Sequence, residues 1–165
     1  MLNKRIASSV LAITIMLSPI QTKAFDMNQW YSDYMNEEYI KLTKFNELYT
    51  ICERFNVNIN DIEEVEFKIT GYSSLPEENG GYTVTCNGEP LVGNILANNT
   101  IPQGTKIILD GVEYTVADRG SSRFNKTNRL DMLINRLPNE SDNEYRKRVS
   151  DFGVKYIKGY VIKNK

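Results

Sequence analysis

The chain has no histidine and only two cysteines among its 165 residues. The lack of histidine excludes catalytic sites in which a histidine activates a serine or a cysteine. It also argues against a zinc site, because two cysteines without histidine do not supply the usual ligand sets. The formal net charge of −1 gives no excess of positive charge for binding nucleic acid. Carboxylate and serine–lysine chemistry remain, and we expect no metal or organic cofactor.

The two cysteines, Cys52 and Cys86, leave two possibilities open. In an oxidising compartment they could form a disulfide. Otherwise each is a small, isolated apolar side chain.

Residues 1–24 have the layout of a bacterial export signal. Lys4 and Arg5 precede a mostly apolar run over residues 6–20, and a small-residue cleavage site follows before Phe25. The run is short for a membrane span, which needs about 20 residues, although an uncleaved anchor is the alternative. We expect a secreted, cell-wall-associated protein that meets the membrane only through this segment before cleavage.

Residues 25–62 are predicted to form a helical lead-in to a single domain. Their apolar side chains recur mainly at steps of three and four residues, namely Tyr39, Ile40, Phe45, Leu48, Tyr49, Cys52 and Phe55. Such a stripe is typical of packing on a core. A separate recognition role for Trp30, Tyr31 and Tyr34 is the alternative.

Residues 63–165 are predicted to form a mainly β domain. Val65, Phe67 and Ile69 alternate with charged residues, as in a half-buried strand. Asp110-Gly111 is a strong hairpin signal. Ser141 with Glu144 forms a capping box for a late helix that ends at Gly153. Together with further strands expected at 82–86, 92–97, 106–109, 112–117, 130–134 and 154–162, this pattern indicates a small β-barrel.

Two carboxylates, Asp118 and Asp131, flank a loop rich in glycine, serine and asparagine, each at the edge of an expected strand. Paired acids suit the cleavage of glycosidic bonds, because one carboxyl can protonate the leaving oxygen while the other assists.

A series of short motifs over residues 68–163 resembles a 3D domain, a family named for three characteristic aspartates. The matching segments are Ile69-Thr70-Gly71-Tyr72, Gly88-Glu89-Pro90, Ile101-Pro102-Gln103-Gly104-Thr105, Ala117-Asp118-Arg119-Gly120, Asn128-Arg129-Leu130-Asp131 and Phe152-Gly153. This domain is similar to the C-terminal part of the MltA class of lytic transglycosylases, with a looser likeness to rare lipoprotein A-type proteins and expansins. The resemblance implies a six-stranded double-psi β-barrel that cleaves peptidoglycan glycan strands.

The chain departs from the family pattern in two places. An aspartate is usual shortly before the Ile-Pro-x-Gly-Thr element, where this chain has Leu96-Ala97-Asn98-Asn99. The loop between Asp118 and Asp131 is also slightly longer than usual. The missing acid could be structural in the family, so activity need not be lost.

The resemblance assigns the acid/base role to Asp131, for cleavage of the MurNAc–GlcNAc bond with a 1,6-anhydro product. Such a carboxyl must start protonated, and its apolar neighbours in sequence would raise its pKa. Asp118 would be a like-charge neighbour. The alternatives are that Asp118 caps a turn, and that Asp131 forms an ion pair with Arg119 or Arg129.

Five further residues are candidates for substrate binding. Tyr72 could form a platform for a sugar ring or belong to the core. Thr70, Thr105 and Asn128 could bond sugar hydroxyls or acetamides, and Arg119 could meet lactyl or peptide carboxylates.

Three functions therefore remain open. The chain could be a lytic transglycosylase, a cell-wall-binding or wall-loosening barrel without cleavage, or a protein-interaction or inhibitor module. The expected partner is peptidoglycan, and the sequence does not indicate an oligomeric state.

Overall fold

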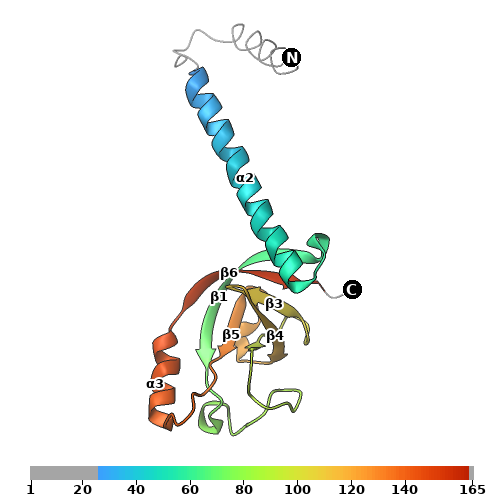
Figure 1. Cartoon of the computed structure of the whole chain (residues 1–165). Coiled ribbons are helices and arrows are strands. Elements are labelled where there is room, and N and C mark those ends of the chain that lie inside the picture. Colours follow the sequence, from blue (N-terminus) through green and yellow to red (C-terminus); the bar gives the residue numbers. More distant parts are fainter. Residues whose placement is uncertain (1–25, 164–165) are drawn as a thin grey trace. The chain divides into compact units, whose positions relative to one another are not determined.

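The computed structural model describes residues 26–163, which fall into two units, residues 26–45 and residues 46–163 (Figure 1). The expected export signal lies outside the described residues. No helix in the described range is both long and apolar enough to cross a membrane.

Helix α2 (Met27–Phe55) runs through the first unit into the second and ends before Asn56, whose φ is 52°. This agrees with the helix expected from the apolar spacing. In the first unit, Tyr39 and Ile40 are exposed. In the second unit Cys52 is buried, and the hydroxyl of Tyr160 donates to the Glu47 carboxylate at 3.3 Å, so the last turns of α2 belong to the barrel unit.

The second unit is a closed, mixed barrel of six strands. They are β1 (Ile62–Tyr72), β2 (Ile95–Ala97), β3 (Lys106–Leu109), β4 (Val112–Asp118), β5 (Arg129–Leu133) and β6 (Lys155–Ile162). Their order round the barrel is β1-β5-β2-β4-β3-β6, with β1–β5 and β2–β4 parallel and the other pairs antiparallel. The predicted mainly β fold, a six-stranded barrel with a late helix and an N-terminal helical extension, is confirmed.

Local sequence signals account for several of these elements. Asp110 and Gly111 both take positive φ, 48° and 72°, as a two-residue hairpin between β3 and β4 requires. The capping box of Ser141 and Glu144 starts α3 (Asp142–Phe152), which ends before Gly153 and lies beside β1 (Figure 1).

Buried apolar side chains from β1 to β5 fill the barrel interior, and the half-buried Ile157 and Val161 of β6 pack against them. The buried cluster comprises Phe67, Ile69, Leu96, Ile101, Ile107, Leu109, Val116, Leu130 and Met132. In β1 this follows the predicted alternation, since Phe67 and Ile69 are completely buried while Glu66 is exposed.

The prediction of a strand over residues 82–86 is wrong. This segment is a loop whose one bridge joins Val84 to Pro90. The hydroxyl of buried Thr85 accepts the backbone N–H groups of Asn87 and Glu89, which turns the chain back on itself. Side-chain bonds of this kind compete with a strand ladder. Likewise β2 starts at Ile95 rather than at residue 92, because the preceding segment is irregular.

Gly159 marks a point of close approach between β6 and the core. A Cβ built there would lie 2.5 Å from Leu109 Cδ2 and 3.0 Å from the Ile108 carbonyl oxygen. We therefore expect Gly159→Ala to lower the free energy of unfolding by about 1–3 kcal/mol in urea titrations followed by circular dichroism. Lys158→Ala, on the exposed neighbour, is the control, and equal stability of the two variants would contradict the close packing.

Candidate active site

Four neighbouring strands place one residue each in a row across the barrel. Thr70 on β1 pairs with Asp131 on β5, Asp131 pairs with Ala97 on β2, and Ala97 pairs with Asp118 on β4. Directly paired residues present their side chains on the same face of a sheet. Because neighbouring strands lie about 4.8 Å apart, the backbones of the two aspartates are about 10 Å apart. We call these four residues the acid row.

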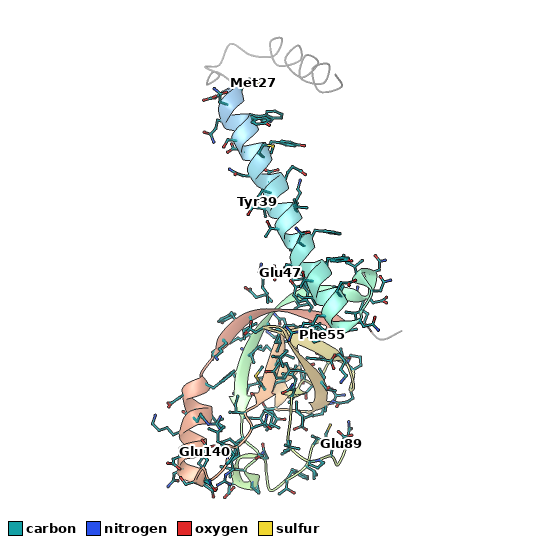
Figure 2. All side chains as sticks on the ribbon, in the orientation of Figure 1. Met27, Tyr39, Glu47, Phe55, Glu89 and Glu140 are labelled. Atoms are coloured by element: carbon teal, nitrogen blue, oxygen red, sulfur yellow. The ribbon has the colours of Figure 1, made fainter. Side chains whose placement is uncertain are left out.

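The acid row forms the floor of a cleft of about 950 Å³. One wall comes from the 3-10 helix η2 (Pro76–Glu78) and residues 79–91, a loop on which Glu89 is labelled in Figure 2. The other wall comes from residues 119–124, which include the 3-10 helix η3 (Ser122–Phe124). The cleft therefore opens over both acids, and its volume is at the upper end of the usual range for ligand sites.

Asp131 is half-buried on this floor, and its Oδ1 accepts a hydrogen bond of 2.6 Å from the Thr70 hydroxyl. Burial raises the pKa of Asp131 above the usual range for aspartate. The Thr70 hydrogen bond and the charge of Arg123 oppose this rise in pKa, whereas the charge of Asp118 adds to it. In the described part of the chain, Asp131 forms no ion pair with Arg119 or Arg129, so the arrangement favours a carboxyl that can donate a proton.

Asp118 is held differently, because it accepts hydrogen bonds on both oxygens. Oδ1 accepts the backbone N–H groups of Cys86 at 2.9 Å and Arg119 at 2.8 Å. Oδ2 accepts the Tyr72 hydroxyl at 3.1 Å. The bond to Arg119 is the local turn bond considered from sequence, while the bond to Cys86 ties the 79–91 loop to the barrel. Asp118 thus combines a place on the cleft floor with a structural role.

Tyr72 lines the cleft, but its hydroxyl is engaged by Asp118. Burial, together with the charge of Asp118, raises the pKa of Tyr72, so the phenol stays a neutral donor. The aromatic side chain that lies open on the cleft wall is Tyr82, which is 69% exposed. Sequence reasoning missed Tyr82 as a candidate because it assigned this segment to a strand.

Two of the predicted substrate-binding side chains are not brought to the cleft. Thr105 is buried, and its backbone bonds Pro102 and Val116 in the turn before β3. Asn128 is exposed beside β5, where its carbonyl accepts the Lys68 N–H. Neither residue lines the cleft.

Arg119 does line the cleft, but its guanidinium is hydrogen-bonded to the protein backbone. Nη1 donates to the backbone carbonyls of Asn98 and Ile101. These bonds join the end of β4 to the segment that follows β2.

Asn98 occupies the stretch where the resemblance leads one to expect an acid. It is completely buried, and its Nδ2 donates to the carbonyls of Lys126 at 2.8 Å and Arg129 at 2.6 Å. Its Oδ1 accepts the backbone N–H groups of Thr100 and Ile101. An aspartate could not donate the first two bonds, so these partners fit an amide. The neighbouring Ala97 places only a methyl group between the two acids of the row.

Cys52 and Cys86 are both free thiols, the first buried and the second exposed at the cleft. The structure therefore has the unpaired form of the two possibilities. Burial raises the pKa of the Cys86 thiol, and the charge of Asp118 adds to the rise. Within residues 26–163, no cluster of three or more potential metal-ligating side chains is found.

Comparison of the chain with known proteins gives no matching family model and no matching curated protein.

The two acids should respond in opposite ways to neutralisation. Since burial raises the pKa of Asp131, its charged form costs stability, and the folded protein loses stability as the pH rises through that pKa. We expect Asp131→Asn to increase the free energy of unfolding at neutral pH, with the gain disappearing as the pH falls towards the unfolded-state value of about 3.9. Asparagine keeps an oxygen that can accept from Thr70.

Asp118→Asn is the matched comparison. It replaces a charged acceptor of three hydrogen bonds by a neutral amide, so we expect a loss of about 1 kcal/mol at neutral pH. Denaturant titrations of both variants between pH 3.5 and 8 measure these differences. A destabilised Asp131→Asn protein at neutral pH would contradict the assigned environment of Asp131.

Proposed function

We propose that this chain is a secreted peptidoglycan lytic transglycosylase in which Asp131 is the acid/base. The observation that carries the proposal is a half-buried carboxyl with a raised pKa on the floor of a wide, open cleft. The resemblance to the 3D domain supports the same residue in the same role.

A single carboxyl can perform both proton transfers of this reaction. Protonated Asp131 donates its proton to the oxygen of the bond between N-acetylmuramic acid and N-acetylglucosamine. The C6 hydroxyl of the muramyl residue attacks C1 and closes the 1,6-anhydro ring as the C1–O bond breaks. The Asp131 carboxylate then takes the proton from O6, which returns the enzyme to its starting state without consuming water.

The neighbours of Asp131 fix its position and charge. The Thr70 hydroxyl holds Oδ1 from β1 and leaves Oδ2 for the substrate. The Asp118 carboxylate, two strands away, contributes negative charge to the cleft where positive charge develops at C1. The methyl group of Ala97 leaves the space between them open to a sugar ring.

A wall-binding or wall-loosening barrel without cleavage is the second candidate. The observation that favours it is the replacement of an expected acid by uncharged residues at Ala97 and Asn98, next to both remaining acids. Such a protein would use the same cleft to hold glycan without transferring a proton.

The first test is mass spectrometry of the soluble products released from purified peptidoglycan. We expect muropeptides that end in 1,6-anhydro-muramic acid, at a rate about 10²–10⁴-fold lower for Asp131→Asn because the proton donor is lost. Asp151→Asn, on an exposed carboxylate of α3, is the matched control and should retain full activity. Products with reducing ends would instead indicate hydrolysis, and a protein that sediments with the wall but releases nothing would be the binding barrel.

The pH dependence of the rate tests the role of Thr70. Because Asp131 must start protonated, the rate should fall as the pH rises through its pKa. The Thr70 hydrogen bond lowers that pKa, so Thr70→Val should raise it and move the alkaline limb of the profile to higher pH. Thr127→Val, at an exposed position outside the cleft, should leave the limb in place. A shift to lower pH in Thr70→Val would contradict the assignment.

A further inference from the structure

The charged side chains that line the cleft differ in how far their partners already satisfy them. Glu78 faces Arg146 at 3.5 Å and accepts a bond from Ser73. Asp118 accepts its three hydrogen bonds, and Arg119 donates to two carbonyls, as described above. These groups therefore hold the walls of the cleft together.

Arg123, on η3, is the exception. Its Nε donates to the Ser121 hydroxyl at 3.0 Å, and its guanidinium carbon lies 5.8 Å from the centre of the Phe124 ring. Its two Nη groups take part in no hydrogen bond or ion pair with the residues that the structure describes. The side chain is exposed and lines the cleft, so these four N–H donors are open to a ligand.

The wall that carries Arg123 is firmly built. Phe124 is 4% exposed and packs so closely on Gly120 that a Cβ there would lie 2.5 Å from its ring. The Asn99 amide donates to the carbonyls of Gly120 and Ser121 and to the side chain of Asn125. Because the Arg123 side chain contacts Ser121 and Phe124 of this wall, it loses little conformational entropy when it binds a ligand.

The charge of Arg123 also reaches the candidate acid, since it is one of the influences that lower the pKa of Asp131. Arg123 and Asp131 line the same cleft, so a ligand group held by Arg123 would occupy the cleft that holds the bond to be cleaved. The planar pair of Nη groups matches a carboxylate, which a guanidinium can bind through two parallel hydrogen bonds.

We propose that Arg123 recognises a carboxylate on the saccharide, so that the cleft selects acidic glycans, with a lactyl or peptide carboxylate near the scissile bond, over uncharged chains of N-acetylglucosamine. The inference rests on the proposed function for the glycan class of the ligand. It adds the substituent by which the cleft distinguishes one glycan from another.

Calorimetric titration of the full chain tests this, with Asp131→Asn as the background so that nothing is cleaved. The probes are a tetrasaccharide of alternating N-acetylglucosamine and N-acetylmuramic acid, and the same compound with its lactyl carboxylates converted to amides. Arg123→Gln should weaken binding of the acidic probe about tenfold and leave binding of the amidated probe unchanged. Arg123→Lys keeps the charge but loses the planar pair of Nη groups. Its affinity for the acidic probe should lie between those of the unsubstituted background and Arg123→Gln.

Lys126→Gln is the matched control, because it removes the same charge from the same loop at an exposed position that does not line the cleft. Equal weakening by Arg123→Gln and Lys126→Gln would overturn the proposal in favour of general electrostatic attraction. Equal affinity of the unsubstituted background for both probes would also overturn it while leaving the proposed function standing. Binding of neither probe would overturn both.

Discussion

The register of the barrel strands is the constraint on which the rest of the site depends. The parallel pairing of β1 with β5 sets Thr70 against Asp131, and the short antiparallel pairing of β5 with β2 sets Asp131 against Ala97. The bulge after Leu96 then brings Asp118, rather than Ala117, opposite Ala97. A slip of one residue in β5 would turn Asp131 into the barrel interior and Leu130 into the cleft, which burial of the apolar face prevents.

Two side chains of the same type acquire different properties on this floor. Asp131 is half-buried, and this burial favours a carboxyl that holds its proton, while its one short hydrogen bond, from Thr70, opposes the effect. Asp118 has three donors around it and works as an acceptor that fastens the cleft wall. The two carboxyls therefore differ in burial and in hydrogen bonding although both lie on the floor of the same cleft.

The features that sequence could predict are those encoded by neighbours along the chain. Asp110-Gly111 specifies its hairpin, Ser141 and Glu144 specify the start of α3, and the alternation around Phe67 specifies β1. The cleft was harder to predict from sequence. The exposure of Tyr82 depends on the Thr85 hydroxyl, which accepts two backbone N–H groups and so prevents this segment from forming a strand. The contacts of Asp118 with Tyr72 and Cys86 join residues 46 and 32 positions apart, which no local pattern encodes.

The hydrogen bonds of Asn98 give the cleft a support that does not change with pH. Its amide joins the last part of the segment between the two acids, at Lys126 and Arg129, to the turn after β2 through four hydrogen bonds to the backbone. An amide carries no ionisable proton, so this joint keeps the same donors and acceptors in acid and in neutral solution. The proposed chemistry at Asp131 thus depends on a proton, while the hydrogen bonds of Asn98 do not change with protonation.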